Sequence, residues 1–328
     1  MRIRGLGLGL VVLGWLWPLV GFAAGARTTV QETQIQGPAP IVASRLATSA
    51  YPKGAKAVVL TSASLAHLAD AVTAAPLAAL LKAPILLTTS DTQVGAATEA
   101  TLKALAPRRV ILVGAVDNPA IRSQLPSGAT VVAYRGSSRY QTAFKVAEAV
   151  AGASGPLNHL YFASGNNQNL TDALTVDPIA AAERAPILLL PPGGGVPAVY
   201  QPLIRRARMI FVVGAAAKYH ARLPHPLDLA GVDRYTTAAE VNQRFFPRPS
   251  GVVVTNAAFL LDALAASPWA GMHRQPVVMV NQDVIPGPSY DYLASLAGNI
   301  HSVLTVGTSG AILPQMAKAV ASLVQTGH

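Results

Sequence analysis

The sequence predicts an α/β protein built from three tandem modules, each with its own parallel sheet. The first observation is an internal repeat, in which an Asp-Ala pair recurs at Asp70, Asp172 and Asp262. A proline follows each Asp by six and by fourteen residues, and Val-Gly ends an apolar run 42 to 45 residues after it. The second observation is that short apolar runs alternate with helical patterns between these markers. Self-similarity at such a period indicates a repeat architecture.

The second unit shows the order of the elements most clearly. We expect a helix, a strand, an Ala-rich helix, a buried strand, a basic helical segment and a further strand, at 140–150, 159–163, 172–184, 187–190, 200–208 and 209–213. Strands that are apolar along their whole length are typical of parallel sheets covered by helices on both faces. Applied to all three repeats, the pattern predicts modules at 41–132, 133–227 and 228–328, each of normal domain size.

The first forty residues have a different character. Two arginines precede an apolar run over 6–20, and small residues cluster at 23–26. This layout predicts a secretory signal peptide over 1–26. A membrane anchor is the alternative, but the run has only about 15 residues, whereas a membrane span needs roughly 20. We interpret 27–40 as a linker and expect no integral membrane span in the mature chain.

The composition limits the chemistry of the protein. The 328 residues include no cysteine, which excludes disulfides, thiolate nucleophiles and cysteine-ligated metals. The formal net charge of +10 favours an anionic partner, which could be a nucleic acid, an acidic polysaccharide or a lipid surface. Nucleic acid is disfavoured because no binding motif is present and aromatic residues, which stack on bases, form only 6% of the chain.

The basic excess lies in the first two modules. Its densest clusters are Arg108-Arg109 and the group Arg205, Arg206 and Arg208, each directly before a predicted strand. These side chains would therefore lie at the amino ends of the strands. Two interpretations remain open: a second contact face for an anionic polymer, or ordinary solvated charge at helix C-termini.

Two stretches carry a resemblance to a known family. They are Leu-Ala-Gly-Val-Asp-Arg-Tyr-Thr-Thr-Ala-Ala at 229–239 and Ala-Ser-Gly-Asn-Asn-Gln-Asn-Leu-Thr-Asp-Ala-Leu at 163–174. With the Ala-Pro-Ile-Leu-Leu and Val-Val-Gly-Ala pieces, the sequence resembles the cell wall-binding repeat 2 family from about residue 41 onward. In the first module, however, no Tyr follows Arg45.

The resemblance has consequences for fold and function. It implies Rossmann-like modules arranged around a pseudo-threefold axis. It also implies non-covalent binding to an anionic secondary polymer of a Gram-positive cell wall, such as a teichoic acid or a phosphate-containing polysaccharide. We therefore expect a secreted protein anchored at the cell wall, and a monomer with an internal pseudo-trimer.

Candidate ligand-binding residues recur in the repeat or lie in the loop after the first strand of a module. Each unit has Arg-x-x-Thr upstream of its Asp, and ligands of open α/β sheets bind beyond the carboxyl ends of the strands. The set is Arg45, Thr48, Asp70, Arg139, Thr142, Ser164, Gly165, Asp172, Arg234, Thr237 and Asp262. For the three Asp, three roles remain open: a helix cap or first-turn acid, an Asp–Arg pair within or between modules, and direct ligand contact.

No motif indicates catalysis. The Gly-rich segment 193–195 lacks the Lys-Ser/Thr of a P-loop, and Ser164 lacks the Gly that a nucleophile elbow has two residues earlier. The seven histidines show no zinc-binding spacing, and no carboxylate pair recurs. We expect a non-enzymatic protein with no cofactor and no metal. Two alternatives stay open: a secreted enzyme or enzyme modulator that acts on cell-wall material through inter-module clefts, and a surface-layer or adhesion protein.

Overall fold

Three parallel four-stranded sheets form the frame of the protein, which confirms the predicted α/β fold with one sheet per module. The computed structural model describes residues 30–327, so the predicted signal peptide lies outside the described residues. The first sheet has the order β3 (Ile85–Thr88), β2 (Ala57–Ser62), β4 (Arg109–Val113) and β5 (Thr130–Tyr134). The second has the order β7 (Ile187–Leu190), β6 (His159–Ser164), β8 (Met209–Val213) and β9 (Pro226–Leu229). The third has the order β1 (Gln31–Gln36), β12 (Ser302–Gly307), β10 (Gly251–Asn256) and β11 (Val277–Val280).

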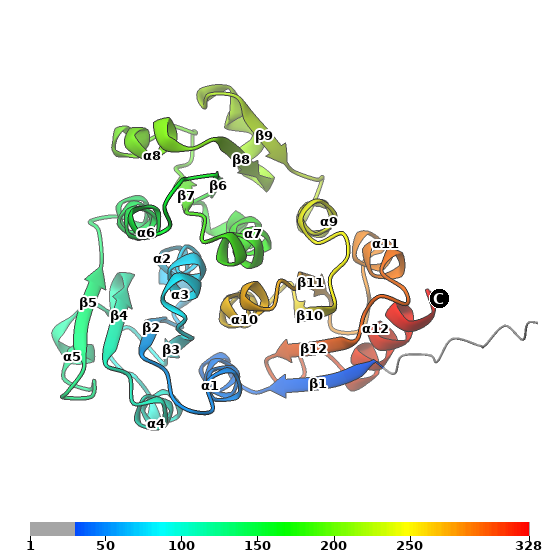
Figure 1. Cartoon of the computed structure of the whole chain (residues 1–328), viewed down its shortest axis with the longest axis horizontal. Coiled ribbons are helices and arrows are strands. Elements are labelled where there is room, and N and C mark those ends of the chain that lie inside the picture. Colours follow the sequence, from blue (N-terminus) through cyan, green and yellow to red (C-terminus); the bar gives the residue numbers. More distant parts are fainter. Residues whose placement is uncertain (1–29, 328) are drawn as a thin grey trace, which may run out of the picture.

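Helices connect the strands and cover the sheets (Figure 1). The longer ones are α1 (Ala39–Ala50), α4 (Ala96–Leu105), α6 (Arg139–Ala153), α7 (Leu170–Glu183), α9 (Arg234–Phe245), α10 (Leu260–Met272), α11 (Gly287–Ser295) and α12 (Pro314–Thr326). The shorter ones are α2 (Leu68–Ala71), α3 (Ala75–Leu81), α5 (Pro119–Arg122) and α8 (Gln201–Arg206). Turns of 3-10 helix lie at η1 (Leu65–His67), η2 (Gly114–Val116), η3 (Asn167–Asn169), η4 (Ala198–Tyr200) and η5 (Gly214–Arg222).

One helix from each module meets the other two at the centre of the molecule. These are α3, α7 and α10, which pack on one another around the pseudo-threefold axis and are seen nearly end-on in Figure 1. Small residues allow the close approach: a Cβ placed on Gly271 of α10 would lie 2.5 Å from the Cβ of Ala181 in α7. The buried core therefore runs continuously through all three modules.

The three central helices are not chemically identical. Asp177 of α7 is completely buried, and neither of its carboxylate oxygens has a hydrogen-bond partner within residues 30–327. Burial raises the pKa of this carboxyl group well above its usual range. The matching positions, five residues after the repeated Asp, are Ala75 and Ser267 in the other two modules.

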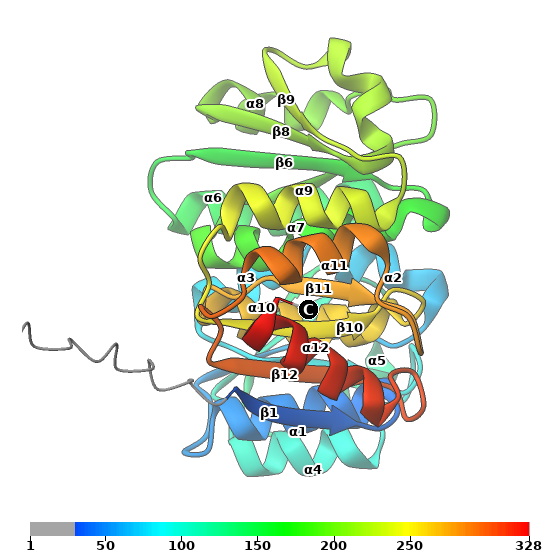
Figure 2. The same ribbon diagram turned by 90° about the vertical axis from the view of Figure 1, so that its right-hand side faces the viewer.

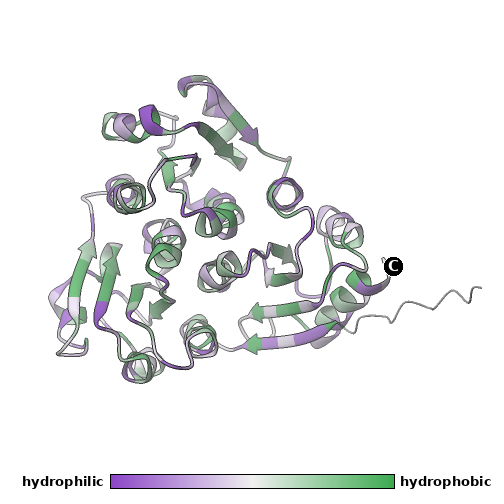
Figure 3. Cartoon of the chain, in the orientation of Figure 1, coloured by the Kyte–Doolittle hydropathy of each residue, from purple (hydrophilic) through white to green (hydrophobic). Residues whose placement is uncertain are grey.

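Strand β1 corrects the interpretation of residues 27–40 as a linker. Gln31 to Gln36 pair in parallel with Ser302 to Gly307 of β12, so the first described strand completes the sheet of the third module. Four of its six side chains are exposed and only Ile35 is buried, and Figure 3 shows the strand as largely hydrophilic. Backbone hydrogen bonds hold this edge strand, and it therefore lacks the apolar run that predicts a buried strand.

The same exchange occurs at the other two module junctions. Strands β5 and β9 lie at the edges of the first and second sheets, and each leads into the first helix of the next module, α6 or α9. The boundaries expected after residues 132 and 227 therefore fall inside β5 and β9. Each module donates its entry strand to its neighbour, and β1 closes the ring.

The helices that alternate with the strands run alongside the axis, as Figure 2 shows for α4, α7 and α9. In parallel β–α–β units each helix runs antiparallel to its strands. The carboxyl ends of all three sheets consequently lie on one side of the molecule, where the helices begin. The amino ends lie on the opposite side, where the helices end.

Candidate functional site

The repeated Asp contacts the repeated Val-Gly motif. Asp172 lies in the first turn of α7, and its Oδ2 accepts a hydrogen bond of 2.8 Å from the backbone N–H of Ala215. The preceding Gly214 has φ +54°, and a Cβ placed there would lie 2.1 Å from the Asp172 carboxyl carbon. Only glycine meets both the backbone angle and the close approach of the carboxylate. The two motifs recur at a similar spacing because they touch.

The other two modules use the same contact with small variations. Asp262 Oδ2 accepts a hydrogen bond of 2.7 Å from the backbone N–H of Thr308, and Asp70 lies against Gly114, where a Cβ would come within 2.6 Å of Asp70 Oδ2. None of the ion pairs formed within residues 30–327 joins these three acids to an arginine, and none of the acids caps its own helix through its side chain. Asp172 and Asp262 instead join the start of a helix to the loop after the central strand by a hydrogen bond. Asp70 lies close to the same loop, but its buried Oδ1 has no hydrogen-bond partner among the described residues.

Burial raises the pKa of all three carboxyl groups. The pKa of Asp262 reaches about 6, although hydrogen bonds from Thr308 oppose the shift. For Asp172 the rise is opposed by the Ala215 N–H and by the charge of Arg234, which belongs to the next module. For Asp70 it is opposed by a hydrogen bond from Thr142, and by the charges of nearby basic side chains. The pKa of Asp172 and that of Asp70 are therefore each lowered in part by residues of the next module.

The Thr of Arg-x-x-Thr fixes the loop that enters its helix. The hydroxyl of Thr142 in α6 accepts a hydrogen bond of 3.1 Å from the backbone N–H of Gly136, and Thr237 in α9 accepts one of 3.1 Å from Gly231. Both threonines are buried. The motif therefore has a structural role at the junction between modules.

The Arg of the motif reaches into its own module. Arg139 and Arg234 are the first residues of α6 and α9. Arg139 donates a hydrogen bond of 2.8 Å to the carbonyl of Gly165 and another to the side chain of Asn167, and Arg234 donates one of 3.1 Å to the carbonyl of Ala257. The predicted residue Gly165 thus holds Arg139.

Ser164 closes the end of β6 beside this contact. Its side chain is largely buried, and its hydroxyl accepts a hydrogen bond of 3.3 Å from the backbone N–H of Asn166. The Ser164-Gly165 pair therefore shapes the turn after the strand, with the Gly165 carbonyl directed to Arg139.

Arg45 and Thr48 are not the counterparts of the other two pairs, which corrects the alignment of the first module. The first residue of α1 is Ala39, so Ala39 and Val42 occupy the positions of Arg139 and Thr142. Arg45 is exposed further along α1 and donates a hydrogen bond to the carbonyl of Gln36, and the Thr48 hydroxyl bonds within its own helix. The Arg-x-x-Thr spacing of the first module therefore lies further along its helix than in the other two modules.

Two cavities lie at module junctions on the carboxyl-end side. Crevice 1/2, between modules 1 and 2, has a volume of about 240 Å³, and crevice 2/3 has about 340 Å³. Crevice 1/2 is lined by Ala66, His67, Ala69, Asp70, Ala115, Arg135, Gly136, Ser137, Ser138, Arg139 and Thr142. Crevice 2/3 is lined by Gln168, Asn169, Thr171, Asp172, Gly214, Ala215, Gly231, Val232, Asp233, Arg234 and Thr237. The structure thus groups the Asp of one module with the Arg and Thr of the next.

The junction between modules 3 and 1 has a different chemistry. Asp262 and Thr308 occupy the positions of Asp172 and Ala215, but the entering helix offers Ala39 and Val42 in place of an arginine and a threonine. This junction therefore lacks the cation and the hydroxyl that crevices 1/2 and 2/3 have at these positions.

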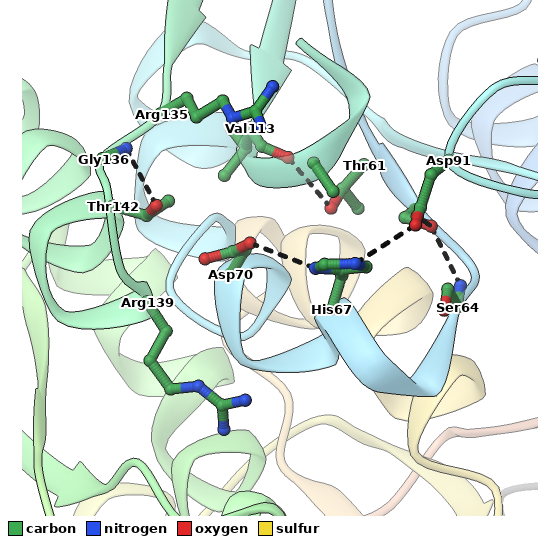
Figure 4. Close-up of polar contacts among 12 residues, drawn as sticks. Thr61, Ser64, His67, Asp70, Asp91, Val113, Arg135, Gly136, Arg139 and Thr142 are labelled. Carbon is green, nitrogen blue, oxygen red and sulfur yellow. Dashed lines mark hydrogen bonds and ion pairs between the residues drawn. The ribbon is translucent and has the colours of Figure 1, made fainter. Parts of the chain in front are cut away.

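Several residues of crevice 1/2 were not among the predicted site residues (Figure 4). Arg135 donates a hydrogen bond of 2.6 Å to the carbonyl of Asp117, and His67 Nε2 lies 3.1 Å from Asp91 Oδ2. Ser138 caps α6 by accepting a hydrogen bond of 3.3 Å from Gln141 N–H. The signal for this loop was the glycine three residues before each helix-starting Arg, which appears in both Gly-Ser-Ser-Arg and Gly-Val-Asp-Arg.

From residue 30 to 327, no helix is both long and apolar enough to cross a bilayer. In the same part of the chain, no group of three or more His, Asp or Glu side chains is placed to hold a metal ion.

The fold and crevices define a class of protein: three α/β modules in a closed ring, with polar cavities at the carboxyl ends of the sheets. The chain belongs to the Cell wall binding domain 2 (CWB2) family, which matches residues 37–118, 134–219 and 229–317. This match confirms the resemblance seen in the sequence. Cell wall binding domains imply a location at the cell surface.

Known relatives and structures agree with this assignment. The chain is 29% identical to N-acetylmuramoyl-L-alanine amidase LytC of Bacillus subtilis over 81% of its own length and 53% of that protein. It is 24% identical to the amidase enhancer of the same organism over 74% of its length and 33% of that protein. The solved structures Cwp6 and Cwp8 from Clostridium difficile share its fold, each with a TM-score of 0.79, at 22% and 19% identity. The match covers 92% of this chain and 49% of Cwp6, and 90% of this chain and 52% of Cwp8. The chain therefore spans about half the length, or less, of these proteins.

Proposed function

We propose that this protein binds an anionic secondary polymer of a Gram-positive cell wall non-covalently and is thereby anchored at the cell surface. The polymer would be a teichoic acid or a phosphate-containing polysaccharide, and its principal site would be crevice 1/2. One observation carries this proposal. His67, Arg135 and Arg139 line this cavity together with the N-terminus of α6, a helix of 15 residues.

Two features of crevice 1/2 favour the binding of a phosphate group: the N-terminus of α6 with its neutral cap, and the weak opposition of the nearby carboxylates. The backbone N–H groups and dipole at a helix N-terminus favour an anion, and the neutral side chain of Ser138 caps α6. The carboxylates nearby oppose the anion less than their number suggests. Burial raises the pKa of Asp70, and Asp91 is held by His67 and by a hydrogen bond of 2.5 Å from Ser62.

Crevice 2/3 is less favourable for an anion. Asp233 caps α9 by accepting hydrogen bonds of 2.7 Å from Thr236 N–H and 2.9 Å from its hydroxyl, and the N–H bond lowers the pKa of Asp233. A negative charge therefore already occupies the start of that helix. Crevice 2/3 would act as the weaker of the two sites.

Co-sedimentation with purified wall sacculi tests the proposal. We expect the protein to sediment with sacculi that carry their secondary polymer and to stay in solution after acid extraction of that polymer. Moderate salt should weaken the retention without abolishing it. Equal binding to polymer-free peptidoglycan would contradict the proposal.

A pair of variants tests whether the polymer binds in crevice 1/2. Arg135→Ala removes a charge from the cavity, and Lys318→Ala removes a charge from an exposed position on α12. We expect the first variant to lower retention several-fold and the second to leave it unchanged. Equal losses would show that net charge, and not the crevice, governs retention.

A second candidate is modulation of an enzyme that acts on the wall. It is favoured by the similarity to the amidase enhancer over 74% of this chain. Release of soluble sugar or amine from sacculi, with this protein alone and with an added wall amidase, measures such an activity. A rate that does not change on addition of the protein would eliminate this candidate.

A further inference from the structure

The amino-end side of the ring carries basic side chains at positions repeated by the pseudo-threefold axis. Lys82, Arg184 and Arg274 lie at the ends of the central helices α3, α7 and α10, with similar positive φ angles of 50°, 54° and 51°. Because these helices surround the axis, the three cations are arranged around it on one face.

A second set of positions repeats in front of the central strands. The backbone N–H groups of Arg108, Arg208 and His301 each bond to a carbonyl just before the neighbouring strand, at 3.1, 3.0 and 2.8 Å. Attraction to helix dipoles accounts for cations at the ends of α3, α7 and α10. Arg108 and Arg208 directly precede β4 and β8, and they follow the ends of α4 and α8 by three and two residues.

In module 2, the position after the central helix and the position before the central strand both line a cavity of about 480 Å³. This cavity is larger than either crevice. Arg184 and Arg208 line it together with Asn158, His159, Glu183 and Met209. Neither guanidinium group makes a hydrogen bond or an ion pair with a side chain or carbonyl in the described chain. The charges of both arginines are therefore available to a ligand.

The acidic residue of the cavity is already paired. Glu183 Oε2 lies 2.6 Å from His159 Nδ1 and accepts a hydrogen bond of 3.1 Å from the Tyr161 hydroxyl. His159 also packs edge-on against the ring of Phe211, which fixes its orientation. The carboxylate is thus held by His159 and Tyr161, whereas both arginines of the lining are without such a partner among the described residues.

We propose that this cavity, which we call the amino-end site, is a second polymer-binding site that takes a phosphodiester-linked saccharide unit. Two guanidinium groups suit a phosphate through paired N–H donors, and the Asn158 amide can bond to sugar hydroxyls. The volume is that of a small-molecule pocket. The identity of the ligand class rests on the proposed function, but the site is distinct from the crevices and lies at the opposite end of the sheets.

Methionine methyl NMR with a poly(glycerol phosphate) oligomer as the probe can test the amino-end site. Met209 lines the cavity, whereas Met316 lies in α12. We expect the probe to shift the Met209 methyl signal, assigned with Met209→Leu, and to leave that of Met316 unchanged. An uncharged dextran oligomer should shift neither. No shift at Met209 under saturating probe would overturn the proposal.

Affinity for the same probe provides an independent readout. The double variant Arg184→Gln/Arg208→Gln should lose at least tenfold in affinity. Lys103→Gln/Lys318→Gln removes the same charge from exposed helix positions and should lose less than twofold. Arg184→Lys/Arg208→Lys keeps the charge but not the paired donors, and should give an intermediate affinity. All four positions are exposed, and unchanged thermal midpoints would verify folding.

The outcomes separate this site from the proposed function. If the two double Gln variants lose affinity equally, the protein binds the probe by its overall positive charge, and the proposal of an amino-end site is wrong. If Arg184→Gln/Arg208→Gln binds the probe as the unmodified protein does while Arg135→Ala loses retention on sacculi, crevice 1/2 alone is the polymer site. If the unmodified protein binds neither probe nor sacculi, the proposed function itself fails.

Discussion

Crevices 1/2 and 2/3 have the same frame and different linings. In both, an Asp of one module meets the loop after its central strand, and a Thr of the next module holds a glycine N–H. Around this frame, crevice 1/2 has Ser138 and Arg135 where crevice 2/3 has Asp233 and Ala230. The comparison shows that the repeated residues build the junction, whereas the residues that vary between repeats set its charge.

The largest effect is expected where a glycine meets the repeated Asp, and it tests whether both crevices depend on this contact. Gly214→Ala and Gly114→Ala place a Cβ 2.1 and 2.4 Å from the facing Asp, at φ +54° and +73°. Each should destabilise the protein by about 3 kcal/mol or more, because the clash involves a buried acid and a left-handed backbone. Urea unfolding measures this loss. Gly307→Ala is the control, since its Cβ would be 3.6 Å from the nearest atom, and a comparable loss there would refute the explanation.

The next effect is a pH dependence of stability that arises from Asp262, at the junction between modules 3 and 1. Folding raises the pKa of Asp262 from 3.8 to about 6, so the folded state binds the proton more tightly than the unfolded state. Stability from this group is therefore greatest below pH 3.8, falls as the pH rises through 3.8 to 6, and is level above. The slope is about 1.4 kcal/mol per pH unit, or roughly 3 kcal/mol in total.

Asp262→Asn isolates this contribution. The Asn side chain can still accept a hydrogen bond from Thr308 N–H but does not titrate in this range. The difference in unfolding free energy between the two proteins should change across the window from pH 3.8 to 6. A constant difference would show that the pKa of Asp262 is not raised.

A smaller effect distinguishes the two crevices in binding. Arg139→Ala should lower retention on sacculi about tenfold, and Arg234→Ala about twofold, because a neutral cap leaves the α6 N-terminus open to an anion. Both arginines also hold a carbonyl of their own module, so thermal midpoints must be compared first. Equal losses of retention would contradict the predicted order of the sites.

The smallest effect exchanges the linings directly. Ser138→Asp should weaken binding about threefold, and Asp233→Ser should strengthen it by a similar factor. Serine and aspartate cap helices about equally well, so stability should change little. Binding that does not respond to either exchange would mean that the helix N-termini are not part of the site.

Much of the frame could be predicted from the sequence. The repeated Asp and the buried strands gave the three modules, because apolar runs such as Ile187–Leu190 have few alternatives once Pro and Gly bound them. An Asp–Arg pair was one of the roles left open for the repeated Asp, and none of the ion pairs within residues 30–327 forms it. Asp172 is bonded instead to the backbone N–H of Ala215, and this contact joins segments more than forty residues apart.

The features that the sequence analysis did not predict have physical reasons. Strand β1 is polar because an edge strand needs no apolar side chains on its open face. The pairing of Arg45 with Thr48 matched a spacing but not a place in the helix, and the residues just before each helix, such as Arg135, vary between repeats. The residues that build the frame recur in the repeats, whereas the residues that line a binding site need not recur.

The pairing of β1 with β12 also has a consequence for how the chain folds. The two strands come from opposite ends of the described chain, so the third sheet stays incomplete until both are available. Such a long-range pairing is expected to form late and slowly. Until then β1 exposes unpaired backbone groups, and its Gln, Glu and Thr side chains protect it from pairing with the wrong strand. The polarity that conceals this strand in the sequence thus keeps it available until the ring can close.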